Sequence, residues 1–287
     1  MAATDDRSVA LCRILLRLQL RRMRDARGLT ASSVAKQFGW STARMTRLET
    51  KDTAVEIGDV RLLCDLYEAP RELREELENY AKITKTRKDW WDLKPFKGTI
   101  PAWFQAYLGL EAAATTLDIY QSEFIPGLAQ DPEYAREILS LSDADEKTQE
   151  VQAEVRLKRQ SILDRPQPPT VTIVLNEAVI RRPIGPGGVM RRQLERLLKL
   201  AAAPHVNVHV LPFSAGAHPA MHGPFTLLDF ADETVGDLAY LENLVDGGVL
   251  SDESVVTPFS DAFSKLRELA ASTEASERMI KSAISAL

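Results

Sequence analysis

The sequence predicts two domains, an all-α domain at the N-terminus followed by an α+β domain with a small sheet. Its 287 residues are enough for about two hydrophobic cores. Apolar residues recur at helical spacing in the first part of the chain, and the alternation typical of strands begins near residue 171. We therefore expect an N-terminal domain over residues 1–82, a linker over residues 83–99 and a second domain over residues 100–287.

Composition excludes several classes of protein. Hydrophobic residues make up 45% and charged residues 27%, as in ordinary globular chains. Cys12 and Cys64 are the only cysteines, too few for a disulfide framework, and no apolar stretch is long enough to span a bilayer. The start of the chain lacks the basic and then apolar layout of a signal peptide. We expect a cytoplasmic protein with no membrane partner.

Charge is unevenly distributed along the chain. The net charge is -5, yet residues 1–88 contain 18 Lys and Arg against 13 Asp and Glu. Residues 7–51 alone contain 11 basic residues, opposed only by Asp25 and Glu49. A basic segment on an otherwise acidic chain favours a local polyanion site such as one for nucleic acid. A solvated helix surface explains the charge equally well.

The N-terminal domain is predicted to consist of five short helices. In the first, Leu16, Leu20 and Met23 form an apolar stripe, and Gly28 ends the helix. A second, basic stripe of this helix contains Arg13, Arg17, Arg21 and Arg24. The other four helices are expected from Thr30 or Ser32 to Phe38, from Ser41 to Thr50, over residues 57–67, and from Pro70 as first helical residue.

Residues 31–50 carry the most specific motif. Ala35 stands where two steeply crossing helices leave room for no more than a methyl group, and Gly39 supplies the positive φ of the turn. Met45 and Leu48, three residues apart, pack the next helix onto the first two. This pattern predicts a helix-turn-helix whose second helix enters a DNA major groove. An ordinary α-hairpin is the alternative.

The residues that face away from this packing are the candidate contacts with double-stranded DNA. Base-reading side chains are expected at Thr42, Ala43, Arg44, Thr46 and Arg47. Phosphate contacts are expected from Arg27, Ser32, Ser33, Lys36 and Lys51. The fork of an arginine can bind guanine O6 and N7, and a small side chain can touch a thymine methyl group.

The second domain is predicted to mix helices and strands. In the linker, the aromatic pair of Asp89-Trp90-Trp91 is expected to act as an anchor. Helices are expected over residues 101–163, with a break at Pro126-Gly127. Alternation predicts strands over residues 171–175, 206–210, 225–229 and 238–242. Further helices are expected over residues 189–202 and from residue 255 onward.

Several short motifs resemble those of a known family. Gly28-Leu29-Thr30, Ala35, Gly39-Trp40-Ser41 and Arg47-Leu48-Glu49 are similar to the Xre/Cro-type helix-turn-helix regulators. Motifs of the remaining chain resemble actinobacterial regulators that join such a domain to a C-terminal domain of unknown function. These motifs are Asp89-Trp90-Trp91, Pro126-Gly127-Leu128, Glu133-Tyr134-Ala135-Arg136, Arg156-Leu157-Lys158-Arg159-Gln160, Val210-Leu211-Pro212-Phe213 and Gly216-Ala217-His218.

The resemblance implies sequence-specific DNA binding as a homodimer, through the same five base-reading positions. For the second domain it implies association with a small partner protein, often encoded nearby, or with a signal ligand. Two residues depart from the family pattern. Ala31 stands where many members have a phosphate-binding Gln, which weakens one phosphate contact, and Lys51 stands where a Gly usually ends the reading helix.

Signatures of common enzymes are not found in the sequence. It contains no P-loop, no dinucleotide fingerprint, no H-E-x-x-H, no paired C-x-x-C and no G-x-S-x-G. The four histidines, His205, His209, His218 and His222, stand close together without a nearby carboxylate or cysteine, so a half-solvated strand and loop is favoured over a metal site. Near Arg181 and Arg182, Gly185-Pro186-Gly187-Gly188 favours a turn over an anion cradle. No catalytic site, metal or cofactor is expected.

Together these observations predict a DNA-binding transcriptional regulator whose C-terminal domain senses a ligand or docks a small partner protein. The alternative is an antitoxin-like or adaptor protein that mainly binds a small partner protein and autoregulates its own promoter. An enzyme that uses the histidine cluster is a third reading.

Overall fold

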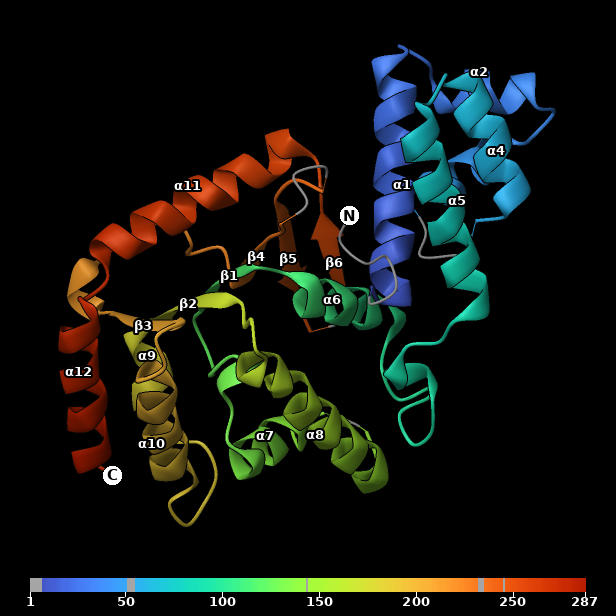
Figure 1. The fold of residues 1–287 in the computed structure, drawn as a ribbon. Coiled ribbons are helices and arrows are strands. Elements are labelled where there is room, and N and C mark those ends of the chain that lie inside the picture. Colours follow the sequence, from blue (N-terminus) through green and yellow to red (C-terminus); the bar gives the residue numbers. More distant parts are fainter. Residues whose placement is uncertain (1–6, 51–54, 143, 232–234, 245) are drawn as a thin grey trace. The chain divides into compact units, whose positions relative to one another are not determined.

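The computed structural model describes residues 7–50, 55–142, 144–231, 235–244 and 246–287, which form two compact units (Figure 1). The helical unit contains the described residues up to Lys97 together with residues 101–113 and Val235, and the α+β unit contains the others. The predicted fold class, an all-α N-terminal domain followed by an α+β domain, is confirmed. In the described ranges, no helix is long and apolar enough to cross a membrane.

The helical unit contains the five predicted helices and, after them, a sixth. In the described residues these helices are α1 (Val9–Ala26), α2 (Ala31–Gln37), α3 (Thr42–Thr50), α4 (Ile57–Leu66), α5 (Arg71–Thr86) and α6 (Ala102–Ala113). Gly28 and Gly39 adopt φ angles of 63° and 66° in the turns that follow α1 and α2. One detail of the prediction is wrong: Pro70 is the N-cap residue of α5, so the helix begins one residue later.

Side-chain caps explain where α2 and α3 begin. Thr30 and Ser33 form a reciprocal capping box at the start of α2. The Ser41 hydroxyl accepts the N–H of Arg44 at 3.2 Å at the start of α3. Both caps use hydroxyl groups of the kind that the sequence analysis expected, because a hydroxyl oxygen satisfies N–H groups that have no partner within the helix.

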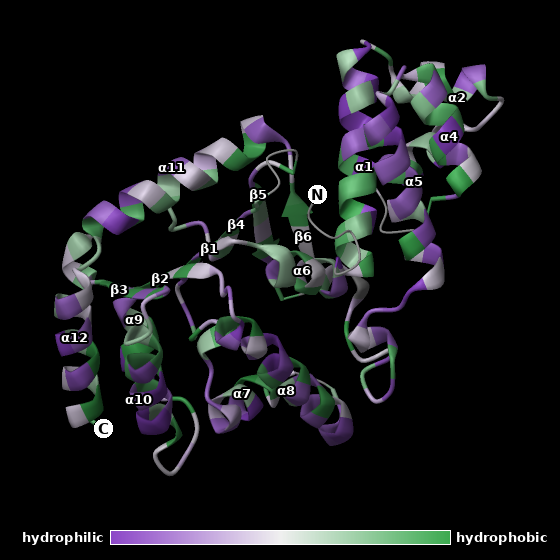
Figure 2. Cartoon of the chain, viewed as in Figure 1, coloured by the Kyte–Doolittle hydropathy of each residue, from purple (hydrophilic) through white to green (hydrophobic). Residues whose placement is uncertain are grey.

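Most residues in the N-terminal half of α1 are buried, and its apolar positions extend beyond the single predicted stripe, while Arg13 and Arg17 are half-buried (Figure 2). It packs against both α5 and α6. The buried residues of α1 are Val9, Ala10, Leu11, Cys12, Ile14, Leu15, Leu16, Gln19 and Leu20. Burial against two neighbouring helices is typical of a core element, and α1 is the core helix of this unit.

A glycine allows α6 to approach α1 closely. A Cβ atom on Gly109 would lie 2.6 Å from the Cβ of Ala10 and 2.8 Å from the hydroxyl oxygen of Ser8, closer than side chains pack. Only a glycine therefore fits at this crossing. The helical unit consequently extends beyond residue 100, where the sequence analysis placed the start of the second domain.

The segment that follows α5 is held against the start of α1. The Asp89 carboxylate accepts hydrogen bonds from the N–H groups of Val9 and Ala10, at 2.8 and 3.0 Å. A carboxylate at a helix N-terminus satisfies free N–H groups and complements the helix dipole. Trp91 is buried, and Trp90 lies edge-on to it with ring centroids 5.2 Å apart. The aromatic pair anchors this segment, as expected.

The α+β unit is built on a six-stranded sheet with the order β3-β2-β1-β4-β5-β6. The strands are β1 (Thr116–Gln121), β2 (Thr170–Asn176), β3 (Val206–Leu211), β4 (Phe225–Asp229), β5 (Leu238–Glu242) and β6 (Gly247–Leu250). The first three strands are parallel, and each later pair is antiparallel. Tyr120 on the central β1 lies opposite Val174 on one side and Phe225 on the other.

Two of these strands were not predicted. β1 lies within residues 101–163, for which the sequence analysis expected only helices, so that part of the prediction is wrong. Ile119 and Tyr120 are both buried, because helices cover both faces of the sheet and blur the alternation of β1. β6 has four residues, and two of them are glycines, which are rare in strands. Short strands of this kind carry little sequence signal.

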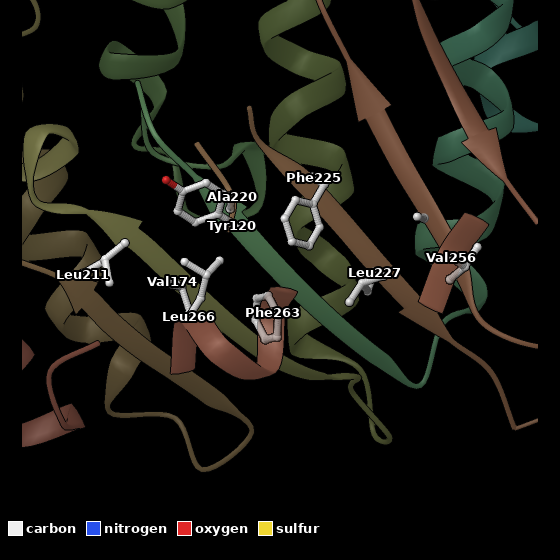
Figure 3. Close-up of a cluster of buried hydrophobic side chains, with 10 residues drawn as sticks. Tyr120, Val174, Leu211, Ala220, Phe225, Leu227, Val256, Phe263 and Leu266 are labelled. Carbon is white, nitrogen blue, oxygen red and sulfur yellow. The ribbon is translucent and has the colours of Figure 1, made fainter. Parts of the chain in front are cut away.

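Helices cover both faces of the sheet, with α7, α8 and α10 on one side and α11 on the other (Figure 1). The helices of this unit are α7 (Pro132–Leu139), α8 (Glu146–Gln160), α9 (Glu177–Arg181), α10 (Val189–Ala201), α11 (Glu253–Leu269) and α12 (Thr273–Ser285). A hydrophobic core lies between the sheet and α11, where Tyr120, Val174 and Phe225 pack with Phe263 and Leu266 (Figure 3). Aromatic rings supply much of the apolar area that stabilises this core.

Buried amide side chains hold the turn over residues 126–130. Gln160 of α8 donates to the carbonyl groups of Gly127 and Gln130, each at 2.9 Å. Gln193 of α10 donates to the carbonyl of Ala129 at 2.8 Å. Buried carbonyl groups need such partners, because water does not reach them. The conspicuous Pro126-Gly127 motif is therefore explained by the fold.

We expect Gly109→Ala to lower the free energy of unfolding by about 1–3 kcal/mol, because the new methyl group overlaps Ala10 and the two helices must separate. Gly58→Ala in α4 is the matched control, since no atom lies within 4 Å of a Cβ atom placed there. Urea unfolding of both variants measures the difference. Equal stabilities would contradict the close packing of α6 on α1.

Candidate nucleic-acid interface

The helices α2 and α3 form the predicted helix-turn-helix. Val34 and Ala35 of α2 are buried, as are Met45 and Leu48 of α3. The N–H group of Trp40 donates to the carbonyl of Ala35 at 2.8 Å and closes the turn between the helices. The structure thus confirms the residues that the motif placed on the inside of this pair.

The opposite face of α3 is open to solvent. Thr42, Ala43, Thr46 and Arg47 are exposed, and Arg44 is half-buried. Arg47 has no polar partner among the described residues. As far as the described residues are concerned, its guanidinium N–H donors are available to an external acceptor. The five side chains that the sequence predicted to read bases share one short helix, and four of them are fully on its exposed side.

Three of the residues predicted to contact phosphate, Ser32, Ser33 and Lys36, lie in α2. Ser32 and Lys36 are exposed. Ser33 is exposed as well, but its hydroxyl donates to the carbonyl of Thr30 at 2.8 Å as part of the capping box. Lys51 lies outside the described residues. Ser32 and Lys36 are therefore the members of this group whose polar ends are most available.

Arg27, another predicted phosphate contact, pairs with Glu68 at 2.6 Å. This hydrogen bond raises the pKa of Arg27 and lowers that of Glu68. Both side chains are exposed, and such ion pairs contribute little because water screens them. A phosphate group can therefore replace Glu68 as the partner of Arg27.

A largely buried ion pair joins α1 to the end of α3. The Nε and Nη2 atoms of Arg24 donate to the two carboxylate oxygens of Glu49, at 2.6 and 2.8 Å. The Nη1 atom donates to the carbonyl of Leu29 at 2.7 Å. The side chains of Arg24 and Glu49 are 12% and 5% exposed, and their hydrogen bond raises the pKa of Arg24. A bidentate pair fixes orientation as well as distance, so it sets how α3 lies on α1.

Arg44 is held by two residues that the sequence analysis did not assign to the site. Its Nη2 atom donates to both carboxylate oxygens of Asp59, at 3.0 and 2.8 Å. Its guanidinium carbon lies 4.2 Å from the centroid of the Trp40 ring. Asp59 belongs to the first turn of α4, where a carboxylate complements the helix dipole. Acidic residues in first turns are common, so sequence gave no sign of this contact.

The histidines of the α+β unit are used locally. The Nδ1 atom of His209 lies 3.0 Å from a backbone carbonyl oxygen. His218 packs edge-on against an aromatic ring, and burial lowers its pKa. His205 is half-buried and His222 is exposed. Among the described residues, no group of three or more His, Cys, Asp or Glu is arranged to hold a metal ion.

The two arginines near the glycine-rich segment are both paired. Arg181 binds Glu177 at 2.7 Å, and Arg182 binds Glu123 at 2.9 Å. The glycines at positions 185, 187 and 188 all have positive φ angles, as a turn into α10 requires. The segment is thus a turn whose neighbouring guanidinium groups already have carboxylate partners.

Buried residues on the inside of α2 and α3, a glycine turn between them and an exposed second helix define a helix-turn-helix protein. The model of a helix-turn-helix domain matches residues 15–77. The model of a domain of unknown function, DUF5753, matches residues 104–282, which is more than half of the chain. The chain therefore belongs to the DUF5753 family and carries a helix-turn-helix domain before it. No curated protein and no solved structure matches the chain.

We expect Arg24→Ala to lower the free energy of unfolding by about 2–4 kcal/mol, because it leaves the buried Glu49 carboxylate without its partner. Arg71→Ala is the control, since it removes an exposed guanidinium that pairs with Glu75 one turn along α5 and should change stability little. Thermal unfolding compares the two variants. Similar melting temperatures would show that the Arg24 pair does not organise the unit.

Proposed function

We propose that this protein is a sequence-specific transcriptional regulator of the Xre/Cro type that binds double-stranded DNA. The observation that carries the proposal is the exposed face of α3, on which Arg47 has no polar partner among the described residues. The helix-turn-helix match over residues 15–77 supports it. On DNA this face enters the major groove, where Thr42, Ala43, Arg44, Thr46 and Arg47 meet base edges and Arg47 is the principal reader.

The distribution of charge supports the same surface. Residues 7–51 contain 11 basic residues against two acidic ones, so the segment attracts phosphate groups. We assign phosphate contacts to Ser32 and Lys36, which are exposed on α2, and to Arg27, which exchanges a screened pair with Glu68 for a phosphate. Ser33 and Lys51 complete the proposed set.

The α+β unit is proposed to dimerise the chain and to bind an effector, either a signal ligand or a small partner protein. A single helix-turn-helix buries a limited surface on DNA, so one half-site gives weak binding. Two linked domains make the second contact intramolecular, which raises the affinity for a two-half-site operator. The proposal places the protein in the cytoplasm and includes no catalytic activity.

We expect Arg47→Ala to remove preference for one base in each half-site, at about 1–3 kcal/mol if the lost contact is bidentate. Lys36→Ala should instead weaken binding to all sequences alike and reduce the salt dependence by about one phosphate contact. Selection from a random duplex pool, followed by titration with single-base variants of the selected sequence, measures both effects.

The two variants act as controls for each other, because both remove one positive charge from the same surface. If Arg47→Ala keeps the wild-type base preference, α3 is not the reading helix. If neither variant changes binding at all, the surface formed by α2 and α3 is not the DNA-binding surface.

The full-length chain should sediment as a dimer and bind two half-sites, spaced about one helical turn apart, much more tightly than one. The full chain is the right sample because α6 packs on α1, so a chain cut before α6 lacks part of the helical unit. Sedimentation with and without each duplex gives the stoichiometry. A monomer with equal affinity for one and two half-sites would contradict the proposed dimer.

A further inference from the structure

The first turn of α3 contains an arginine whose guanidinium is restrained from two sides. One side carries the ion pair with Asp59, in which the single Nη2 atom of Arg44 donates to both carboxylate oxygens. The flat face lies over the indole ring of Trp40, 4.2 Å from its centroid. The ring of Phe38 lies 5.0 Å from that of Trp40 and supports it. The position and the plane of this guanidinium are therefore both set before DNA binds.

The Asp59 pair differs from the other surface pairs of the helical unit. The Asp59 side chain is 14% exposed, whereas the Glu68 side chain that pairs with Arg27 is 73% exposed. A carboxylate that is largely removed from water interacts more strongly with its partner, because the local dielectric is lower. Water therefore screens the Asp59 carboxylate less than the Glu68 carboxylate, while the Arg44 side chain itself is 43% exposed.

The bond to Asp59 uses the atom that a base contact needs. An arginine binds guanine through two neighbouring nitrogens, either Nη1 with Nη2 or Nε with Nη2, which face O6 and N7 together. Both of these nitrogen pairs include Nη2, and in Arg44 this atom already donates to the two carboxylate oxygens of Asp59. A base at either edge would have to share Nη2 with these two carboxylate oxygens and place its own acceptors beside their negative charge. Held in this way, Arg44 is poorly placed for a bidentate contact.

We propose that Asp59 is a specificity-determining residue: it keeps Arg44 out of bidentate base reading, so that Arg44 meets the major groove without selecting guanine. The inference rests on the proposed function, since it concerns the same reading helix. Base discrimination by arginine then falls to Arg47, which has no polar partner among the described residues. Asp59 itself meets no base and acts through the guanidinium it holds.

The variant Asp59→Asn tests this directly, because the amide keeps the shape of the side chain but removes its charge. In the full-length chain, random-duplex selection should then yield a new guanine preference at one further position per half-site. The preference should be about 5- to 150-fold, the range expected for one bidentate contact. The double variant Arg44→Ala, Asp59→Asn should lose this new preference, since the fork that produced it is gone.

Asp65→Asn is the matched control for the loss of a negative charge. Asp65 lies on the same helix, α4, and pairs with Arg74 rather than with Arg44. Removing its charge should raise affinity for all duplexes alike without a new base preference. Asp59→Ser provides a second uncharged side chain suited to the first turn of a helix, and it should give the same guanine preference as Asp59→Asn.

Two results would overturn the inference. One is an Asp59→Asn protein that folds, by its melting temperature, and selects the wild-type sequence unchanged. The other is a loss of base preference that matches that of Arg44→Ala, which would mean that Asp59 prepares Arg44 for reading. If the wild-type chain selects no sequence, the proposed function fails first and this inference fails with it.

Discussion

The ion pair between Arg24 and Glu49 is the interaction on which the helical unit depends. Three nitrogens of one guanidinium are bound, two by the Glu49 carboxylate and one by the carbonyl of Leu29. The arginine belongs to α1, the carboxylate to α3, and the carbonyl to the turn that precedes α2. One side chain therefore sets the relative placement of three helices. Because α1 is the core helix of the unit, the exposed face of α3 is presented on a rigid support.

The second constraint is that carboxylates form ion pairs with several of the arginines and so reduce the positive charge that is open to a ligand. Arg24, Arg27 and Arg44 all have acidic partners, whereas Arg47 and Lys36 have no polar partner among the described residues. Residues 7–51 are strongly basic by count, but only part of this charge is available to a polyanion. The paired arginines shape the surface, and the unpaired cations are left for recognition.

Much of the helical unit follows from local sequence. The hydroxyl caps, the glycine turns and the buried Ala35, Met45 and Leu48 depend on neighbouring residues, so the motif indicates the helix pair and its exposed face. The ion pairs could not be predicted in this way. Arg24 and Glu49 stand 25 residues apart, and Arg44 and Asp59 stand 15 apart, on different helices. Their partners are fixed by packing and not by spacing.

In the α+β unit, too, features that depend on packing could not be predicted from local sequence. Strand 206–210 alternates in burial and was predicted, and strand 225–229 was predicted although four successive residues of β4 are buried. β1 is as long as β3, but it lies among helical segments and its Ile119 and Tyr120 are both buried. The packing of α6 could not be predicted for a related reason, because α6 lies largely within the stretch matched by the DUF5753 model but packs on α1. α6 can pack there because Gly109 has no side chain. The sequence does not show this, because Gly109 meets Ala10 only in the folded structure.

The exposed face of α3 is proposed to read DNA through the major groove, and methylation interference can show which groove is contacted. Methylation of guanine N7 blocks the major groove, and methylation of adenine N3 blocks the minor groove. On a duplex selected by the full-length chain, we expect N7 methylation at one guanine per half-site to abolish binding, and we expect Arg47→Ala to lose this sensitivity. Interference by N3 methylation alone, or by neither modification, would contradict it.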